Sequence, residues 1–171
     1  MKNLTTLFLL IFGFTAFAQN IDFSNKKKFK DYRIENDKFQ NATFIYAKGF
    51  YNPPDFNSYI VVSDGAASMR LKTYYRGSGW IFMNRVIALV DGEKFEFMVD
   101  NPQRKLGYPK VDEESTTFVD ENILKFMRAA ADPNSEVEVR LQGEKYTDFK
   151  LSKMTKEKFA KILTLYDEIK K

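Results

Sequence analysis

Acidic side chains are the residues of this chain that come closest to a catalytic pattern. Asp112, Glu113 and Glu114 are consecutive, and Glu96 and Asp100 precede them. Two carboxyl groups about 5–9 Å apart in a cleft hydrolyse glycosides, one acting as acid and the other as nucleophile or base. The sequence does not fix such a distance, so a carboxylate-dependent hydrolase is one hypothesis. The alternative for the acidic run is a solvated loop, since its spacing matches no calcium-binding loop.

The residue types that the chain lacks exclude most catalytic mechanisms. The chain contains neither histidine nor cysteine, so it has no Ser-His-Asp or Cys-His nucleophile system and no ordinary zinc site. It also lacks the phosphate-binding and nucleophile-elbow motifs. We therefore expect no catalytic residues, no metal and no cofactor.

A cluster of aromatic and basic residues surrounds the glycine-rich segment 77–79. Tyr74, Arg76 and Trp80 are of the types that stack on a flat ligand and hold a carboxylate or phosphate. The alternative is that these side chains form ordinary cross-strand pairs at the end of a hairpin. We take the three residues as candidate contacts for a ligand or a partner.

A second candidate is the proline-containing segment 49–58, which the sequence predicts to be a loop. Tyr51 and Phe56 lie on either side of Pro53 and Pro54, and prolines stiffen a connection while aromatic side chains make it adhesive. The segment serves either as a recognition loop or as a cover for one end of the sheet.

Two arginines in predicted strands raise a question of charge balance. Arg85 lies in an otherwise apolar strand, and Arg140 lies in a strand of strict alternation. A buried arginine needs a carboxylate partner, for which Asp91, Glu96, Asp100 and the acids at 112–114 are available to Arg85. The two readings are an anion-binding pocket and a structural ion pair.

Alternating polar and apolar residues predict antiparallel strands. The segments are 41–48, 59–63, 68–76, 80–90, 93–100, 136–142 and 145–151. Turns at Asp64-Gly65, residues 77–79 and Asp91-Gly92 would join residues 68–100 into a three-stranded meander. Residues 103–114 are polar and contain Gly107 and Pro109, so they are expected to form a loop.

In two segments the apolar residues recur at the spacing of an α-helix. Asp120 is the predicted N-cap of a helix that contains Ile123, Leu124 and Met127. Thr155 is the predicted N-cap of a second helix at the C-terminus. The fold class expected is α+β, with a meander sheet of about six strands packed against two amphipathic helices in the C-terminal part. The acids interleaved with the basic residues argue against nucleic acid as a partner.

The N-terminus predicts export. Lys2 precedes an apolar run at residues 4–17, and Ala16-Phe17-Ala18 resembles a cleavage site. We expect a signal peptide at residues 1–18, a flexible leader at 19–31, and one α+β domain at 32–171. No stable membrane anchor is expected after cleavage, and the protein would be periplasmic or secreted.

The order of elements from residue 68 onward resembles small bacterial exported proteins of unknown function, rather than any characterised family. The residues that carry the resemblance are Tyr75, Gly77, Trp80, Ile81, Phe82, Arg140, Leu141, Gly143, Tyr146 and Tyr166. The resemblance supports the fold and implies no catalytic residue. The expectation for function is a non-catalytic binding protein whose partner is a protein or small ligand of the cell envelope. An inhibitor or immunity protein against an exported enzyme is a further alternative.

Overall fold

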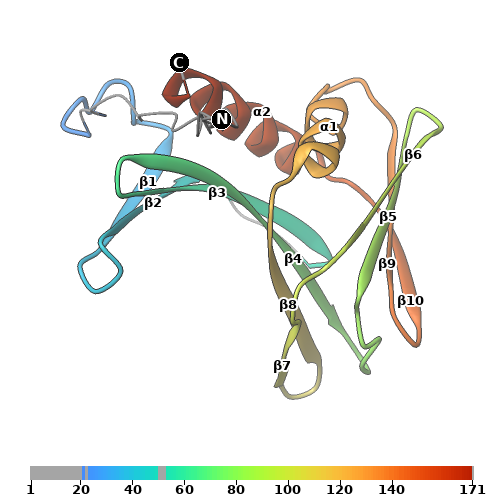
Figure 1. The fold of residues 1–171 in the computed structure, drawn as a ribbon. Coiled ribbons are helices and arrows are strands. Elements are labelled where there is room, and N and C mark those ends of the chain that lie inside the picture. Colours follow the sequence, from blue (N-terminus) through green and yellow to red (C-terminus); the bar gives the residue numbers. More distant parts are fainter. Residues whose placement is uncertain (1–20, 22, 50–52, 171) are drawn as a thin grey trace, which may run out of the picture.

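The computed structural model describes residues 21, 23–49 and 53–170. Over these residues the chain forms two antiparallel sheets and two helices, so the α+β class is confirmed. Figure 1 shows both helices on one side of the larger sheet, with the smaller sheet standing beside them. The predicted single meander is replaced by this two-sheet arrangement.

The larger sheet has six strands in the order β1-β2-β3-β4-β8-β7. Their bounds are β1 Tyr32–Asp37, β2 Ala42–Ala47, β3 Asp55–Ser63, β4 Ala66–Gly77, β8 Val111–Phe118 and β7 Gln103–Leu106. Asp64 and Gly65, both at positive φ, connect β3 to β4 as the sequence predicts. The polar segment 103–114 was expected to be a loop; it instead supplies β7 and the first half of β8.

The smaller sheet has four strands in the order β10-β9-β5-β6. Their bounds are β10 Tyr146–Lys150, β9 Val137–Gln142, β5 Arg85–Val90 and β6 Glu93–Met98. The Asp91-Gly92 hairpin between β5 and β6 is confirmed, with both residues at positive φ.

The expected pairing of β4 with β5 is wrong, because the two strands belong to different sheets. Residues 78–84 cross between the sheets instead of making a hairpin turn. β4 pairs with β8 on the side where β5 was expected. The Glu113 carboxylate accepts hydrogen bonds from the backbone N–H groups of Ile81, Phe82 and Met83. These bonds take the place of the hydrogen bonds between strands that a β4–β5 hairpin would have formed.

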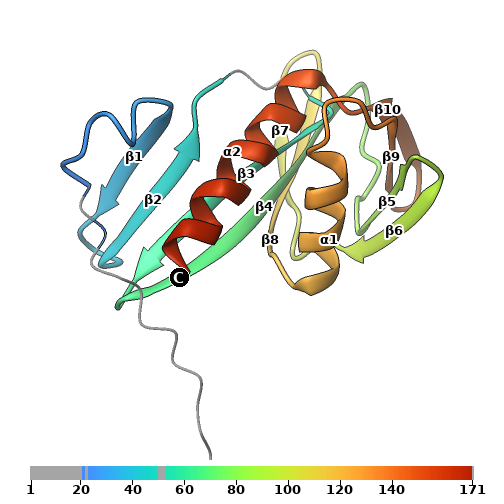
Figure 2. The same ribbon diagram turned by 90° about the horizontal axis from the view of Figure 1, so that it is seen from above.

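α2 lies across one face of the larger sheet, and α1 packs between α2 and strands β5 and β6 of the smaller sheet (Figure 2). α1, Glu121–Ala130, has the predicted N-cap, since the Asp120 side chain accepts a hydrogen bond from the Ile123 N–H. α2, Lys153–Ile169, begins earlier than predicted. Ser152 is its N-cap and Thr155 lies in its first turn.

The core joins both sheets and both helices through aromatic rings. Phe126 of α1 lies 5.8 Å from Phe56 of β3, 5.7 Å from Phe97 of β6 and 6.1 Å from Phe159 of α2, between ring centroids. Phe29 is 5% exposed and packs against this core. Packing therefore extends into the segment 19–31 that was interpreted as a leader; residues 1–18 lie outside the described part.

Candidate functional site

Tyr74 and Arg76 lie together at the end of β4 that pairs with β8. Asp112 of β8 accepts two hydrogen bonds from the Arg76 guanidinium, at 2.6 and 2.9 Å. Another guanidinium N–H donates to the Tyr74 hydroxyl at 3.0 Å. Tyr74 is only 7% exposed. The pair is therefore held within the sheet, and the Arg76 donors already have a carboxylate.

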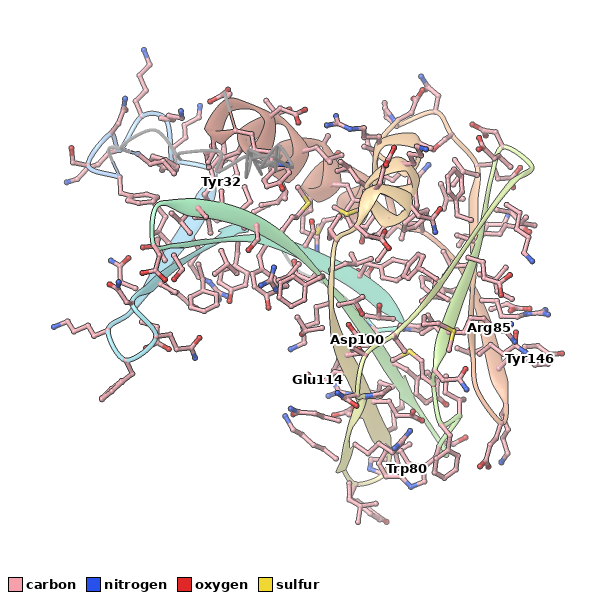
Figure 3. All side chains as sticks on the ribbon, viewed as in Figure 1. Tyr32, Trp80, Arg85, Asp100, Glu114 and Tyr146 are labelled. Atoms are coloured by element: carbon pink, nitrogen blue, oxygen red, sulfur yellow. The ribbon has the colours of Figure 1, made fainter. Side chains whose placement is uncertain are left out.

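The remaining candidate contacts are dispersed. Trp80 lies in the connection from β4 to β5, at the lower end of the molecule in Figure 3. Phe56 is fully buried in the core, because β3 begins at Asp55 and includes what was expected to be loop. A surface contact through Phe56 does not fit this position. Tyr51 lies outside the described residues.

Glu113 is a fully buried carboxylate with a structural set of partners. Its oxygens accept hydrogen bonds from the N–H groups of Ile81, Phe82 and Met83 at 2.7, 2.9 and 2.7 Å. The Arg104 Nε lies 3.5 Å away from the same carboxylate. Such a carboxylate compensates buried backbone donors and one cation.

The other acids of the hydrolase hypothesis also face cations. Glu114 lies 3.0 Å from Lys72 and 3.7 Å from Lys105. Hydrogen bonds from Arg76 hold the pKa of Asp112 below its usual value. Hydrogen bonds from Lys94 and, to a smaller extent, from Arg85 lower the pKa of Glu96. A general acid for glycoside hydrolysis needs a raised pKa, so the two shifts run against that role.

Asp100 lies at the crossing from β6 to β7 (Figure 3). Its backbone, rather than its carboxylate, binds β8. The N–H donates to Thr117 and the carbonyl accepts a hydrogen bond from Ser115. Among the described residues, no three acidic side chains gather closely enough to hold a metal ion.

Arg85 and Arg140 form ion pairs on the outer face of the smaller sheet. Arg85 donates to Glu96 at 2.9 Å, one of the partners considered from the sequence. Arg140 makes two hydrogen bonds of 2.7 Å to Asp148 on the neighbouring strand. A hollow of about 540 Å³ on this face is lined partly by these paired groups.

A different set of residues stands out on the face of the larger sheet turned away from the helices. No described helix or strand covers that face (Figure 1). Strand register aligns one side chain from each of five neighbouring strands, and we call this set the aromatic–arginine row. Its members are Arg33 of β1, Tyr46 of β2, Tyr59 of β3, Arg70 of β4 and Phe118 of β8.

Within the aromatic–arginine row, rings and guanidinium groups stack. Arg33 lies 4.6 Å from the Tyr46 ring, and the rings of Tyr46 and Tyr59 are 4.9 Å apart. Arg70 lies 3.3 Å from the Phe118 ring, which is 65% exposed. Burial, and next the neighbouring Tyr59, raise the pKa of Tyr46. The row is thus half-buried along its middle and open at the Phe118 end.

Arg70 is the member whose charge is least compensated. Among the described residues no carboxylate lies within 4 Å of its guanidinium. One of its N–H groups donates to the Met69 carbonyl at 3.2 Å. Burial lowers the pKa of Arg70, which expresses the cost of desolvating a cation. An anion placed on this face would offset that cost.

A hollow of about 540 Å³ adjoins the row at its β1–β2 end. It is lined by Glu35, Asn36, Asp37, Lys38, Phe39, Phe44 and Tyr46. The Phe44 ring lies 6.2 Å from the Tyr59 ring and so connects this hollow to the row. Sequence reasoning missed the row, because its members come from five strands and only the strand register brings them together.

Comparison with known proteins adds a distant structural neighbour and no family. Family models and curated proteins give no match, in agreement with the expectation that no characterised family is matched. The crystal structure of invasion associated protein B from Bartonella henselae is similar with a TM-score of 0.43 and 13% identity, over 81% of this chain and 92% of that one. A likeness of this strength defines neither family nor function. No helix among the described residues is long and apolar enough to cross a membrane.

Proposed function

We propose that the chain is an exported, non-catalytic binding protein that holds an anionic ligand on the open face of its larger sheet. Arg70 carries this proposal. It is a half-buried cation, stacked on Phe118, without a carboxylate within ion-pairing distance among the described residues.

The aromatic rings beside Arg70 define the rest of the ligand. Tyr59 is directly opposite Arg70 in the strand register, and Tyr46 stacks on Tyr59. Rings held by a sheet offer flat contact area at little cost in side-chain entropy. The surface therefore suits an anionic group attached to a flat body, such as a uronic acid sugar or a peptide with acidic and aromatic side chains.

The alternatives from the sequence receive less support. For a hydrolase, Glu113 is occupied by backbone donors, and Asp112 has a lowered pKa. For an inhibitor of an exported enzyme, the same open face would be the contact surface, with an acidic region of the enzyme as its partner. Export is supported by the charge, apolar run and small residues at positions 1–18.

Calorimetric titration with two carboxylate probes tests the proposal. One probe is an oligogalacturonate and the other a short peptide of alternating phenylalanine and glutamate. Each is compared with its neutral amide. We expect one carboxylate probe to bind better than its amide and Arg70→Gln to weaken that binding about tenfold or more, as expected for a charged hydrogen bond.

The matched control is Arg140→Gln, because Arg140 is paired with Asp148 on the outer face of the other sheet. This variant should bind like the wild type. Equal binding of acid and amide, or unchanged binding by Arg70→Gln, would contradict the proposal. Absence of binding by both probes would favour a protein partner, as the inhibitor hypothesis requires.

A further inference from the structure

The hairpin between β7 and β8 ends in apolar side chains that the fold leaves bare. Leu106 is 87% exposed and Tyr108 is fully exposed. A hydrogen bond of 2.9 Å from the Gly107 N–H to the Lys110 carbonyl closes the turn between the strands. Large apolar side chains that cluster on an exposed turn, with polar residues around them, are typical of a surface that contacts a protein or a membrane.

All charged side chains from Gln103 to Val111 are cations. They are Arg104, Lys105 and Lys110, with no carboxylate in the same segment. The Lys105 side chain is 65% exposed, and its ammonium group lies 3.7 Å from the Glu114 carboxylate. The hairpin tip, residues 105–110, is therefore apolar at its apex and flanked by two lysines. The acids that follow at 112–114 lie further from the tip and pair with Arg76, Arg104 and Lys72.

Further aromatic residues lie beside this hairpin. Val111, at the start of β8, pairs with Gly77, the last residue of β4, which directly precedes the connection carrying Trp80. Phe82 of the same connection is 39% exposed, and the Arg104 guanidinium lies 5.0 Å from its ring. Figure 3 shows Trp80 at the same lower end of the molecule as the β7–β8 hairpin. Trp, Tyr, Phe and Leu thus gather with basic residues at one end.

Another hairpin with an exposed aromatic tip, between β1 and β2, provides a comparison within the chain. Phe39 at its tip is also fully exposed. Its neighbours are the acid Asp37 and the base Lys38, and the Asp37 side chain accepts hydrogen bonds from the N–H groups of Phe39 and Gln40. This tip has an exposed ring but no basic character.

We propose that the β7–β8 tip docks reversibly on an anionic lipid surface. Apolar and aromatic side chains flanked by lysine and arginine are the residues that settle at the boundary between headgroups and acyl chains. Basic residues near an anionic membrane add attraction. Protein interfaces, by contrast, are depleted in lysine. The contact is peripheral, and it does not depend on what the aromatic–arginine row binds.

The chain carries its own reporter for this contact, because Trp80 is its single tryptophan. The chain of residues 1–171 is expressed in cells and purified in the processed form that they produce. It is then mixed with phosphatidylcholine vesicles, either pure or with about 30% phosphatidylglycerol. We expect a blue shift of Trp80 emission and co-sedimentation with the anionic vesicles, both reduced by salt.

Two variants locate the contact. Leu106→Ser with Tyr108→Ser should abolish co-sedimentation. Lys105→Gln with Lys110→Gln should weaken it about 30-fold, in line with the contribution of two cations near an anionic surface. The four residues lie at the exposed end of β7 and in the turn that follows it, so unchanged thermal unfolding verifies that the variants are folded.

The matched controls are Phe39→Ser, which removes a fully exposed ring at a different hairpin tip, and Arg70→Gln, which alters only the proposed ligand face. Both should sediment like the wild type. The proposal is overturned by failure to bind anionic vesicles, by equal binding to both vesicles, or by retained binding in the Leu106/Tyr108 variant. Failure to bind anionic vesicles would indicate that the tip contacts a protein instead.

Discussion

The Glu113 carboxylate of β8 lies 2.7 Å from the backbone nitrogen of Met83, 30 residues earlier in the chain. The contact joins the larger sheet to the segment that enters the smaller one. Ser115 and Thr117, at alternate positions along the same strand, bind the backbone of Asp100 where the chain returns. The inward face of β8 therefore holds the first two of the three crossings between the sheets through polar side chains.

Glu113→Ala should strongly destabilise the fold, because it leaves three backbone N–H groups and Arg104 without their acceptor. We expect a loss on the order of 3–5 kcal/mol in urea denaturation. The matched control is Glu114→Gln at the next position, whose partly solvated ion pairs with Lys72 and Lys105 should contribute about 1 kcal/mol or less. Equal losses in the two variants would show that the buried carboxylate has no special role.

Gly143→Ala should also destabilise the protein. A Cβ at this position would overlap the backbone carbonyl oxygens of Phe82 and Ile81, so the crossing segment would have to move away from the β9–β10 turn. We expect a loss of about 2 kcal/mol or more, measured by thermal or urea unfolding. Gly79→Ala is the control, since a Cβ there has open space around it. A tolerated Gly143→Ala would mean that this contact is looser than described.

The Arg76–Asp112 pair should make stability depend on acid pH. The folded-state pKa of Asp112 is lowered, chiefly by hydrogen bonds from Arg76. The pair therefore stabilises the fold above the ordinary Asp pKa of about 3.9, and its contribution is lost as pH falls through the lower folded value. Arg76→Gln should be less stable than the wild type near neutral pH, and this difference should vanish in strong acid.

Carboxyl NMR titration checks the cause of that effect. In Arg76→Gln the pKa of Asp112 should rise toward its ordinary value. In Arg140→Gln the pKa of Asp148, which Arg140 lowers by hydrogen bonding, should rise while that of Asp112 stays low. An unchanged pKa of Asp112 in Arg76→Gln would contradict the assigned cause.

Local signals in the sequence predicted the local elements well. The Asp64-Gly65 and Asp91-Gly92 turns, the helix after Asp120 and the buried stripe of the last helix are all present. Each depends on residues a few positions apart, so a short stretch of sequence contains the information needed.

The missed elements depend on distant partners. β8 does not show the expected alternation because its buried residues Glu113, Ser115 and Thr117 are polar, and their partners are backbone groups from other segments. The glycine-rich segment 77–79 was predicted to be a hairpin turn, because the sequence does not reveal that β4 and β5 belong to different sheets. The aromatic–arginine row likewise needs the strand register, which a single sequence does not specify.

The order in which the strands are used makes the two sheets inseparable. β5 and β6 leave the larger sheet after β4, and the chain returns for β7 and β8 before adding β9 and β10 to the smaller sheet. No single break in the chain would give each fragment a complete sheet. We therefore expect limited proteolysis to yield no half that folds alone, and both sheets to unfold together in one cooperative transition.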